Sequence, residues 1–299
     1  MRFDRFLLLV LLTGCGDDST TTVIDSALSD TQASVDAAPC TSACGSIQFF
    51  GRGHTFGDRV RWRLDDPATT TPGPTLDVGA GDFTLEWWMR GTAAANPNSI
   101  MCGNGIGWTS SNIILDRDRH SQSPAFGAGV HSASLVWAVV GAAGDSTSMC
   151  GDTIVADGQW HHVAVDRRRS DGRMRIFVDG VLDASADGPD GDVSYPDNGQ
   201  PTSLCPMGLC DYSDPFLVLG AEKHGYPDIS FAGFIDELRV SRVLRYDATF
   251  TPRTTPFDPD ADTVGLYHFD GSATDATGAL DGEVVLGGGG PTWSGETAF

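Results

Sequence analysis

The chain has 299 residues, of which 40 are acidic and 19 basic, and its formal net charge is −21. Nucleic-acid binding requires a basic surface, so this charge excludes that class of function. The charge is compatible with divalent cations and with neutral ligands such as glycans. A simpler explanation is favoured: acidic side chains keep an exported protein soluble.

The N-terminus is typical of an export signal. Residues 1–5 are net positive, and the apolar run 6–12 is far too short to span a bilayer. The following stretch, Leu12–Cys15, resembles the lipobox of bacterial lipoproteins. This implies that Cys15 carries a lipid, which is then the only contact with the membrane. Gly16 favours an outer-membrane lipoprotein of the bacterial cell envelope, and the alternative is an ordinary signal peptide with a chance cysteine.

The sequence therefore predicts three parts: a signal peptide (1–14), a tether (15–39) and one globular domain (40–299). The tether is rich in Asp, Ser, Thr and Ala. It has too few large apolar residues to offset the entropy of ordering, so we expect it to be disordered. The remaining 260 residues (299 minus 39) suit one all-β sandwich with a sizeable core, and the 37 glycines suit its turns.

The stretch 157–185 predicts three consecutive β-strands. Residues 159–167 and 173–179 alternate apolar side chains with a period of two, which is the pattern of a half-buried strand. A short third strand is expected at 181–184. Between the second and third strands, Asp179-Gly180 predicts a type I′ hairpin turn, which needs positive φ at both central residues.

Four strings carry a family resemblance. Gly158–Ala164 and Arg175–Gly180 resemble the central signature of laminin G-like domains, Gly81–Trp88 resembles an upstream strand, and Phe231–Val240 resembles a strand near the C-terminus. Laminin G-like domains belong to the wider concanavalin A-like lectin and glucanase jelly rolls. The resemblance implies an all-β fold, a sandwich of two antiparallel sheets.

The C-terminal third predicts further strands at 231–241, 263–270 and 282–286, the last of these ending the sheet structure. Residues 244–250 could form one short helical turn. The resemblance also implies that the first and last strands share a sheet, so Ile47–Gly51 is expected to pair near Thr263–Asp270.

Seven cysteines are present, and subtracting the lipid-bearing Cys15 leaves six. An even number in an exported chain indicates disulfides, although six cysteines allow 15 pairings. The preferred set closes two small loops and joins two strands: Cys40–Cys44, Cys205–Cys210 and Cys102–Cys150. Metal binding by these thiols is a weaker alternative, because the chain lacks two matching C-x₂-C pairs.

Asp236 is the preferred metal ligand. In the superfamily that the chain resembles, an aspartate on the C-terminal strand commonly helps to hold a structural calcium, with backbone carbonyls as partners. The alternative is that Asp236 only caps a bend. His161 and His162 are adjacent on a strand and point to opposite faces, so they cannot share one ion.

Two acidic loops are further candidate sites. Asp258–Asp262 lacks the glycine and glutamate that an EF-hand loop requires, so a solvated loop is favoured. The long loop Asp187–Gly199 could hold a second calcium or form part of a ligand rim.

Aromatic side chains matter because sugar rings stack on them. Six lie in or next to segments expected to be loops: Trp62, Trp108, Trp137, Tyr195, Tyr212 and Tyr226. Three others, Trp87, Trp88 and Trp160, lie in expected strands and are assigned to the core.

Catalysis is not expected. Retaining glycosidases of the superfamily place two carboxylates about 5 Å apart, usually in a Glu-x-Asp-x-x-Glu pattern, which this chain lacks. It also lacks a Gly-x-Ser-x-Gly elbow. The sequence thus predicts a non-catalytic surface module that binds a glycan or an extracellular protein with structural calcium. A glycoside hydrolase-like enzyme and a passive envelope lipoprotein are the alternatives.

Overall fold

The computed structural model describes residues 45–52, 57–66, 69–119, 122–199, 215–224, 229–285 and 289–299, all within one compact unit, Ser34–Phe299. The predicted signal peptide, tether and Cys15 lipidation lie outside these residues, as do the disulfides Cys40–Cys44 and Cys205–Cys210. They stay predictions. Among the described residues, no helix has the length and apolar character needed to cross a membrane.

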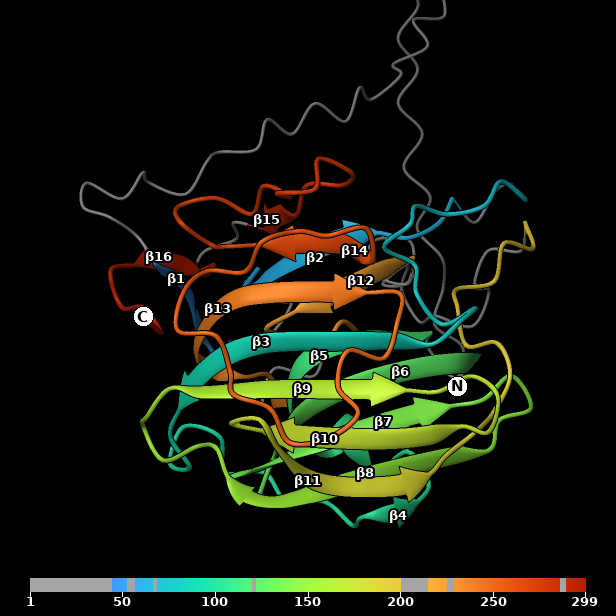
Figure 1. The fold of residues 1–299 in the computed structure, drawn as a ribbon, viewed down its shortest axis with the longest axis horizontal. Coiled ribbons are helices and arrows are strands. Elements are labelled where there is room, and N and C mark those ends of the chain that lie inside the picture. The colour runs from blue at the N-terminus through green and yellow to red at the C-terminus, as the bar shows by residue number, and fades with distance from the viewer. Residues whose placement is uncertain are drawn as a thin grey trace, which may run out of the picture. The chain divides into compact units, whose positions relative to one another are not determined.

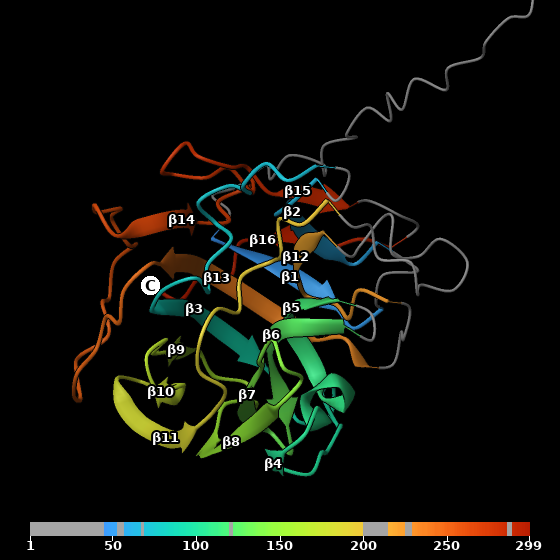
Figure 2. The ribbon, with the colours of Figure 1, turned by 90° about the vertical axis from the view of Figure 1, so that its right-hand side faces the viewer.

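Two antiparallel sheets face each other as layers (Figures 1 and 2). The first has the order β11-β10-β9-β3-β13-β1-β16, with β14 also paired to β13. Its strands are β1 (Ser46–Phe50), β3 (Phe83–Gly91), β9 (His161–Arg167), β10 (Arg173–Val178), β11 (Val181–Asp187), β13 (Ala232–Ser241), β14 (Thr263–Tyr267) and β16 (Thr292–Ser294). The predicted all-β sandwich is confirmed.

The second sheet has the order β15-β2-β12-β5-β6-β7-β8-β4. Its strands are β2 (Arg59–Arg63), β4 (Gly103–Asn104), β5 (Asn112–Arg119), β6 (Gln122–His131), β7 (Ser134–Val140), β8 (Ser146–Ile154), β12 (Phe216–Leu219) and β15 (Glu283–Val285). A short 3₁₀ helix, η2 (Gly107–Ser110), precedes β5.

The hydrophobic core fills the space between the sheets. Phe83 of β3 meets Phe126 and Trp137 of the opposite sheet, with ring centroids 5.3 and 6.0 Å apart. Such aromatic pairs contribute about 1 kcal/mol each beyond the burial of their area. The apolar positions predicted for one face of the central strands all lie in this core: Val163, Val165, Met174, Ile176 and Val178.

The predicted meander is confirmed as β9, β10 and β11. Asp179 and Gly180 have φ values of +50° and +80°, as the type I′ turn requires. A Cβ at Gly180 would also lie 1.9 Å from the carbonyl oxygen of Phe250, so glycine is needed here for space as well. The third strand runs to Asp187, longer than predicted, because Asp187 still pairs with Arg173.

The partner predicted for the first strand is wrong. β1 and β14 share a sheet, but Ile47 pairs with Ile235 of β13, whereas Leu238 of β13 pairs with Tyr267 of β14. An irregularity in β13, where Glu237 has a φ of +55°, separates these two halves of the strand. Each half therefore receives a different neighbour.

The prediction that 282–286 forms the last strand is also wrong. β15 lies within that range, but the chain continues into β16, which pairs with β1. Trp293 of β16 packs against the core, and this burial supports a strand so close to the C-terminus.

Residues 242–262, here called the strap, form an irregular segment that crosses the outer face of the first sheet. In Figure 1 the strap runs in orange in front of β3 and β9 as far as β10. The helical turn expected at 244–250 is absent from it. The Thr84 side chain bonds both the carbonyl of Val243 and the amide of Arg245, so these backbone groups pair with β3 instead of within a helix.

Candidate functional site

A buried polar cluster lies under the strap. Glu86 of β3 is fully buried, and its carboxylate accepts hydrogen bonds from Nε of Arg239 (2.8 Å) and from the Tyr246 hydroxyl (2.5 Å). Nε2 of His162 lies 3.2 Å from the same carboxylate. Burial alone would raise the pKa of Glu86, but the hydrogen bond from His162 and the charge of Arg239 hold it below its usual value. Glu86 is thus an ionised anchor for the strap.

Aromatic rings of the strap fill the same face. Tyr246 and Phe250 are stacked, with centroids 3.5 Å apart, and Phe250 also contacts Phe177 of β10 and His162 of β9. Phe257 packs under the Arg239 guanidinium, 4.3 Å from the ring centroid. The centre of this face is therefore occupied by the protein's own side chains.

The acidic loop at 258–262 forms the end of the strap. Its carboxylates pair with strap arginines: Asp258 with Arg253, and Asp260 with Arg245. Sequence reasoning treated this loop as solvated and missed these pairs.

The two adjacent histidines point to opposite sides, as predicted. His161 lies 2.8 Å from Asp179 and 3.2 Å from Asp157, whereas His162 is buried against Glu86. They do not converge on one site.

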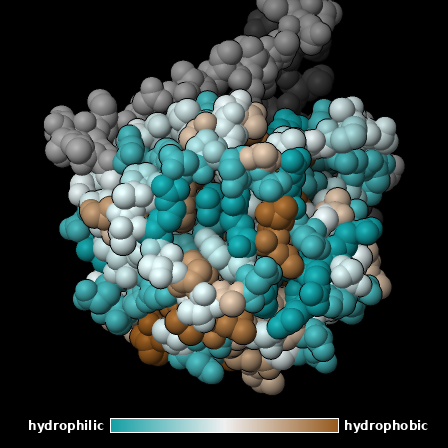
Figure 3. Space-filling model, in the orientation of Figure 1, coloured by the Kyte–Doolittle hydropathy of each residue, from teal (hydrophilic) through white to brown (hydrophobic). Residues whose placement is uncertain are grey.

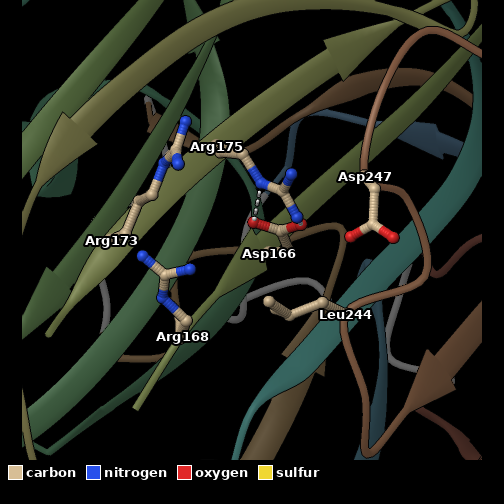
Figure 4. Close-up of a pocket in the computed structure, with 6 residues that line it drawn as sticks. All are labelled: Asp166, Arg168, Arg173, Arg175, Leu244 and Asp247. Carbon is tan, nitrogen blue, oxygen red and sulfur yellow. Dashed lines mark hydrogen bonds and ion pairs between the residues drawn. The ribbon is translucent and has the colours of Figure 1, made fainter. Parts of the chain in front are cut away.

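A small cavity of about 140 Å³, here called the arginine pocket, lies beside the strap. It is lined by Asp166, Arg168, Arg173, Arg175, Leu244 and Asp247. Figure 4 shows Arg168 and Arg173 on one side, Leu244 and Asp247 of the strap on the other, and the Asp166–Arg175 pair between them. Burial raises the pKa of Asp166 to about 6, although the hydrogen bond and charge of Arg175 lower it. Sequence reasoning took 168–172 only as a turn and missed this pocket.

A wider depression of about 420 Å³, here called the rim groove, lies nearby. It is lined by Asn104, Gly105, Gly144, Asp145, Ser146, Thr147, Asp187, Gly188 and Pro189. The start of the loop 187–199, predicted as a ligand rim, thus meets the β7–β8 turn and β4. A Cβ added at Gly105 or Gly144 would meet no atom within 4 Å, so the backbone is open to a ligand there.

The linings of the two cavities include residues from the same strand pair. Arg173, which lines the arginine pocket, is directly opposite Asp187, which lines the rim groove, in the β10–β11 pairing. The loop after β11 is fixed to the arginine-rich turn, since Gly188 N bonds Gly172 O and Gly191 N bonds Arg169 O. The surroundings are mainly hydrophilic, and hydrophobic residues form only small patches on this face (Figure 3).

Asp236 lies in β13 next to the C-terminus and is 2% exposed. Its Oδ2 accepts a hydrogen bond from the amide of Ala298, and burial raises its pKa to about 7. Calcium prefers six to eight oxygen ligands. Among the described residues, Asp236 belongs to no group of three potential metal ligands, so the side chains in place do not form a calcium site. Calcium at Asp236 stays a prediction.

A different acidic group surrounds His224. Its ring nitrogen lies 3.2 Å from Asp118 and 3.4 Å from Glu222, and Asp116 is close by. Burial raises the pKa of Asp116. Neither aspartate was singled out from the sequence, because β5 and the segment after β12 that carries His224 are far apart in the chain.

The Cys102–Cys150 disulfide is present, as predicted. Four of the aromatic residues expected at loops are instead buried: Trp62, Trp108, Trp137 and Tyr195. Trp62 and Trp137 lie within β2 and β7 and point into the core. Tyr212 and Tyr226 lie outside the described residues. Of the three tryptophans assigned to the core, only Trp87 is fully buried, and Trp88 and Trp160 are half-buried.

Comparison with solved structures gives several similar folds. A candidate carbohydrate-binding protein from Bacteroides ovatus is 17% identical with a TM-score of 0.48, and the match covers 81% of this chain and 58% of that one. A pentraxin from Limulus polyphemus is 14% identical (TM-score 0.41, 80% and 94% covered). Domains LG4–5 of the mouse laminin α1 chain are 16% identical (TM-score 0.41, 78% and 50% covered). The chain thus spans less than two thirds of the first and third of these proteins.

A search of curated proteins gave no match. A family model described as the concanavalin A-like lectin/glucanases superfamily matches residues 65–248, which is more than half of the chain. The match includes β3 and the β9–β11 meander, together with both cavities. The chain therefore belongs to the concanavalin A-like lectin/glucanases superfamily, as a laminin G-like domain.

Proposed function

We propose that this domain is a non-catalytic carbohydrate-binding module. The observation that carries the proposal is the rim groove, which is lined by polar side chains and exposed glycine backbone. A sugar presents many hydroxyl groups, and these need both donors and acceptors on the protein. Asn104, Ser146 and Asp145 supply both kinds of group at one groove, and the glycines let a ring approach the backbone.

The state of four of the five glutamates supports a binding role over hydrolysis. Glycosidases need two carboxylates that reach the substrate. Glu86 and Glu237 are 0% and 1% exposed, and Glu237 is held by the amide of Phe257 and by His268. Glu283 and Glu296 pair with Arg61 and Arg90. Since the strap covers the middle of the sheet, Glu86 has no access to a polymer lying on that face.

The test is binding to a broad panel of polysaccharides with a groove-filling variant. Asn104→Trp places a large ring in the rim groove from an exposed position. Thr254→Trp is the matched control, because Thr254 is exposed on the strap and lines neither cavity. We expect Asn104→Trp to weaken binding at least tenfold and Thr254→Trp to leave it unchanged. If no polysaccharide binds, an extracellular protein ligand or a passive envelope role replaces this proposal.

The cellular setting is a further part of the proposal. The lipobox-like sequence supports a lipid anchor at Cys15 on the bacterial cell envelope, which would present the domain to glycans outside the membrane. A Cys15→Ala variant is then expected in the soluble fraction, and its retention in membranes would contradict the anchor.

Calcium at Asp236 can be tested by the melting temperature of the wild type and of Asp236→Asn, each measured with calcium and with chelator.

A further inference from the structure

The turn between β9 and β10 concentrates positive charge. Residues 167–175 contain five arginines and one aspartate, a net charge of +4 (five minus one), in a chain whose net charge is −21. A local field of this sign on an acidic protein attracts anions at short range.

Most of the arginines in this run have structural partners. Arg167 is buried and donates to the carbonyls of Pro189 and Gly191, which fixes the loop after β11. Arg175 binds the carboxylate of Asp166 with two nitrogens. Arg168 does the same with Asp171.

Arg173 differs from these three. Its Nε donates a long hydrogen bond of 3.4 Å to Oγ of Ser185, and no carboxylate among the described residues comes within 4.0 Å of its guanidinium. The side chain is exposed and lines the arginine pocket beside Arg168. Two guanidinium groups therefore flank the cavity, and that of Arg173 forms no ion pair among the described residues, although its charge still acts on the nearby Asp166 and Asp171.

The opposite wall adds an acceptor. Asp247 of the strap lines the pocket across from Arg168 and Arg173 (Figure 4), and no cation among the described residues pairs with it. Asp166 is bound by two nitrogens of Arg175, which offsets part of its repulsion of an incoming anion. A matching ligand needs a negative group for the arginines and, a few ångströms away, a hydrogen-bond donor for Asp247.

We infer that the arginine pocket binds the carboxylate or sulfate group of one sugar in an acidic polysaccharide. Such a sugar carries both an anionic group for Arg173 and a hydroxyl for Asp247. The pocket, about 140 Å³, is smaller than the roughly 300–1,000 Å³ of sites that enclose a whole small molecule. It therefore takes one group of a larger ligand, and the chain of sugars continues toward the rim groove, whose Asp187 is the strand partner of Arg173. This inference rests on the proposed carbohydrate binding and names the class of carbohydrate.

The experiment compares polymers that differ only in charge. Dissociation constants are measured by calorimetry for polygalacturonate and its fully methyl-esterified form, and for dextran sulfate and dextran. We expect at least one charged polymer to bind about tenfold more tightly than its neutral counterpart, the size of one good charge-assisted contact. The two pairs distinguish a carboxylate from a sulfate. Sodium sulfate alone is expected to compete only weakly.

Arg173→Gln is expected to remove about this tenfold preference, because it deletes the exposed charge and leaves the shape of the pocket. Arg168→Gln should act in the same direction. Arg253→Gln is the matched control: it removes the same charge from another exposed arginine, on the strap near the opposite end of β10. Its binding should change less than twofold.

The outcomes separate this inference from the proposed function. Equal binding of charged and neutral polymers, with no effect of Arg173→Gln, overturns the inference and keeps carbohydrate binding. Equal losses in Arg173→Gln and Arg253→Gln show a nonspecific charge effect and also overturn it. Competition by sodium sulfate as strong as by the polymer indicates a small-anion site instead. If no polysaccharide binds, both proposals fail.

Discussion

Tyr246 and Glu86 are 160 residues apart in the chain, and the tyrosine hydroxyl donates a 2.5 Å hydrogen bond to the glutamate carboxylate. This contact connects the strap to the central strand β3 below it. The carboxylate is ionised and buried, so the bond is charge-assisted and stronger than one between neutral groups. The strap therefore covers the middle of the sheet, and the two cavities lie outside this covered area.

Removing this hydroxyl should destabilise the domain. Tyr246→Phe is expected to lower the free energy of unfolding by about 2 kcal/mol, because it leaves a buried carboxylate with one donor fewer. Tyr267→Phe is the comparison: its hydroxyl donates to the neutral carbonyl of Leu280, and the expected loss is about 1 kcal/mol. Urea unfolding of the two variants measures the difference. A smaller loss in Tyr246→Phe than in Tyr267→Phe would contradict the anchoring role.

The same carboxylate should make stability depend on pH. The pKa of Glu86 is lower in the folded than in the unfolded state, so its contribution is present above the unfolded pKa of about 4.3 and is lost as pH falls through the folded pKa. We expect the wild type to lose stability as the pH falls below about 4.3, the unfolded pKa, and Glu86→Gln to lack this part of the pH dependence. Glu283→Gln serves as control, since Glu283 is half exposed and pairs with Arg61 at the surface. An unchanged slope in Glu86→Gln would refute the assignment.

The β9–β11 meander could be predicted because its signals are local. A period-two pattern and an Asp-Gly turn determine it within 30 residues or so, and the pattern divided the residues of the first two strands correctly between the two faces. The expectation that Trp62 lies at a loop was wrong, although a local pattern indicated a strand there. Val60 and Trp62 alternate with Arg59, Arg61 and Arg63, which is a strand with one buried face. Expecting an exposed aromatic there ignored that alternation.

The strap could not be predicted, since its stability comes from distant residues. Tyr246 and Phe250 contact Phe177 and each other, and Tyr246 also bonds Glu86. No local pattern in 242–262 reveals such partners. The arginine pocket was missed for a related reason. A run of arginines in a turn is usually solvated, and only the fold brings Leu244 and Asp247 opposite Arg173.

The Cys102–Cys150 bond should contribute to stability through the loop it closes. The two cysteines are 48 residues apart, and cross-linking a loop of this size restricts the unfolded chain. The double variant Cys102→Ser/Cys150→Ser is expected to lose about 3 kcal/mol in urea unfolding. Reductant should then destabilise the double variant less than the wild type. Equal stability of the two proteins without reductant would show that the native packing alone holds β4 against β8.

Binding of an acidic polymer should strengthen as the pH falls toward 5. Burial raises the pKa of Asp166 to about 6, and Arg168, Arg173, Arg175, Asp82 and Asp247 are the charged groups around it. When Asp166 is protonated, Arg175 is released from its ion pair and adds a third guanidinium to the pocket. Dextran sulfate is the suitable probe because its sulfate esters do not titrate in this range, and we expect its affinity to rise by up to about tenfold from pH 7.5 to pH 5. Asp166→Asn should bind at pH 7.5 as tightly as the wild type does at pH 5, with little further change on acidification. A pH dependence that persists in Asp166→Asn would assign the effect to the general loss of negative charge from this acidic chain.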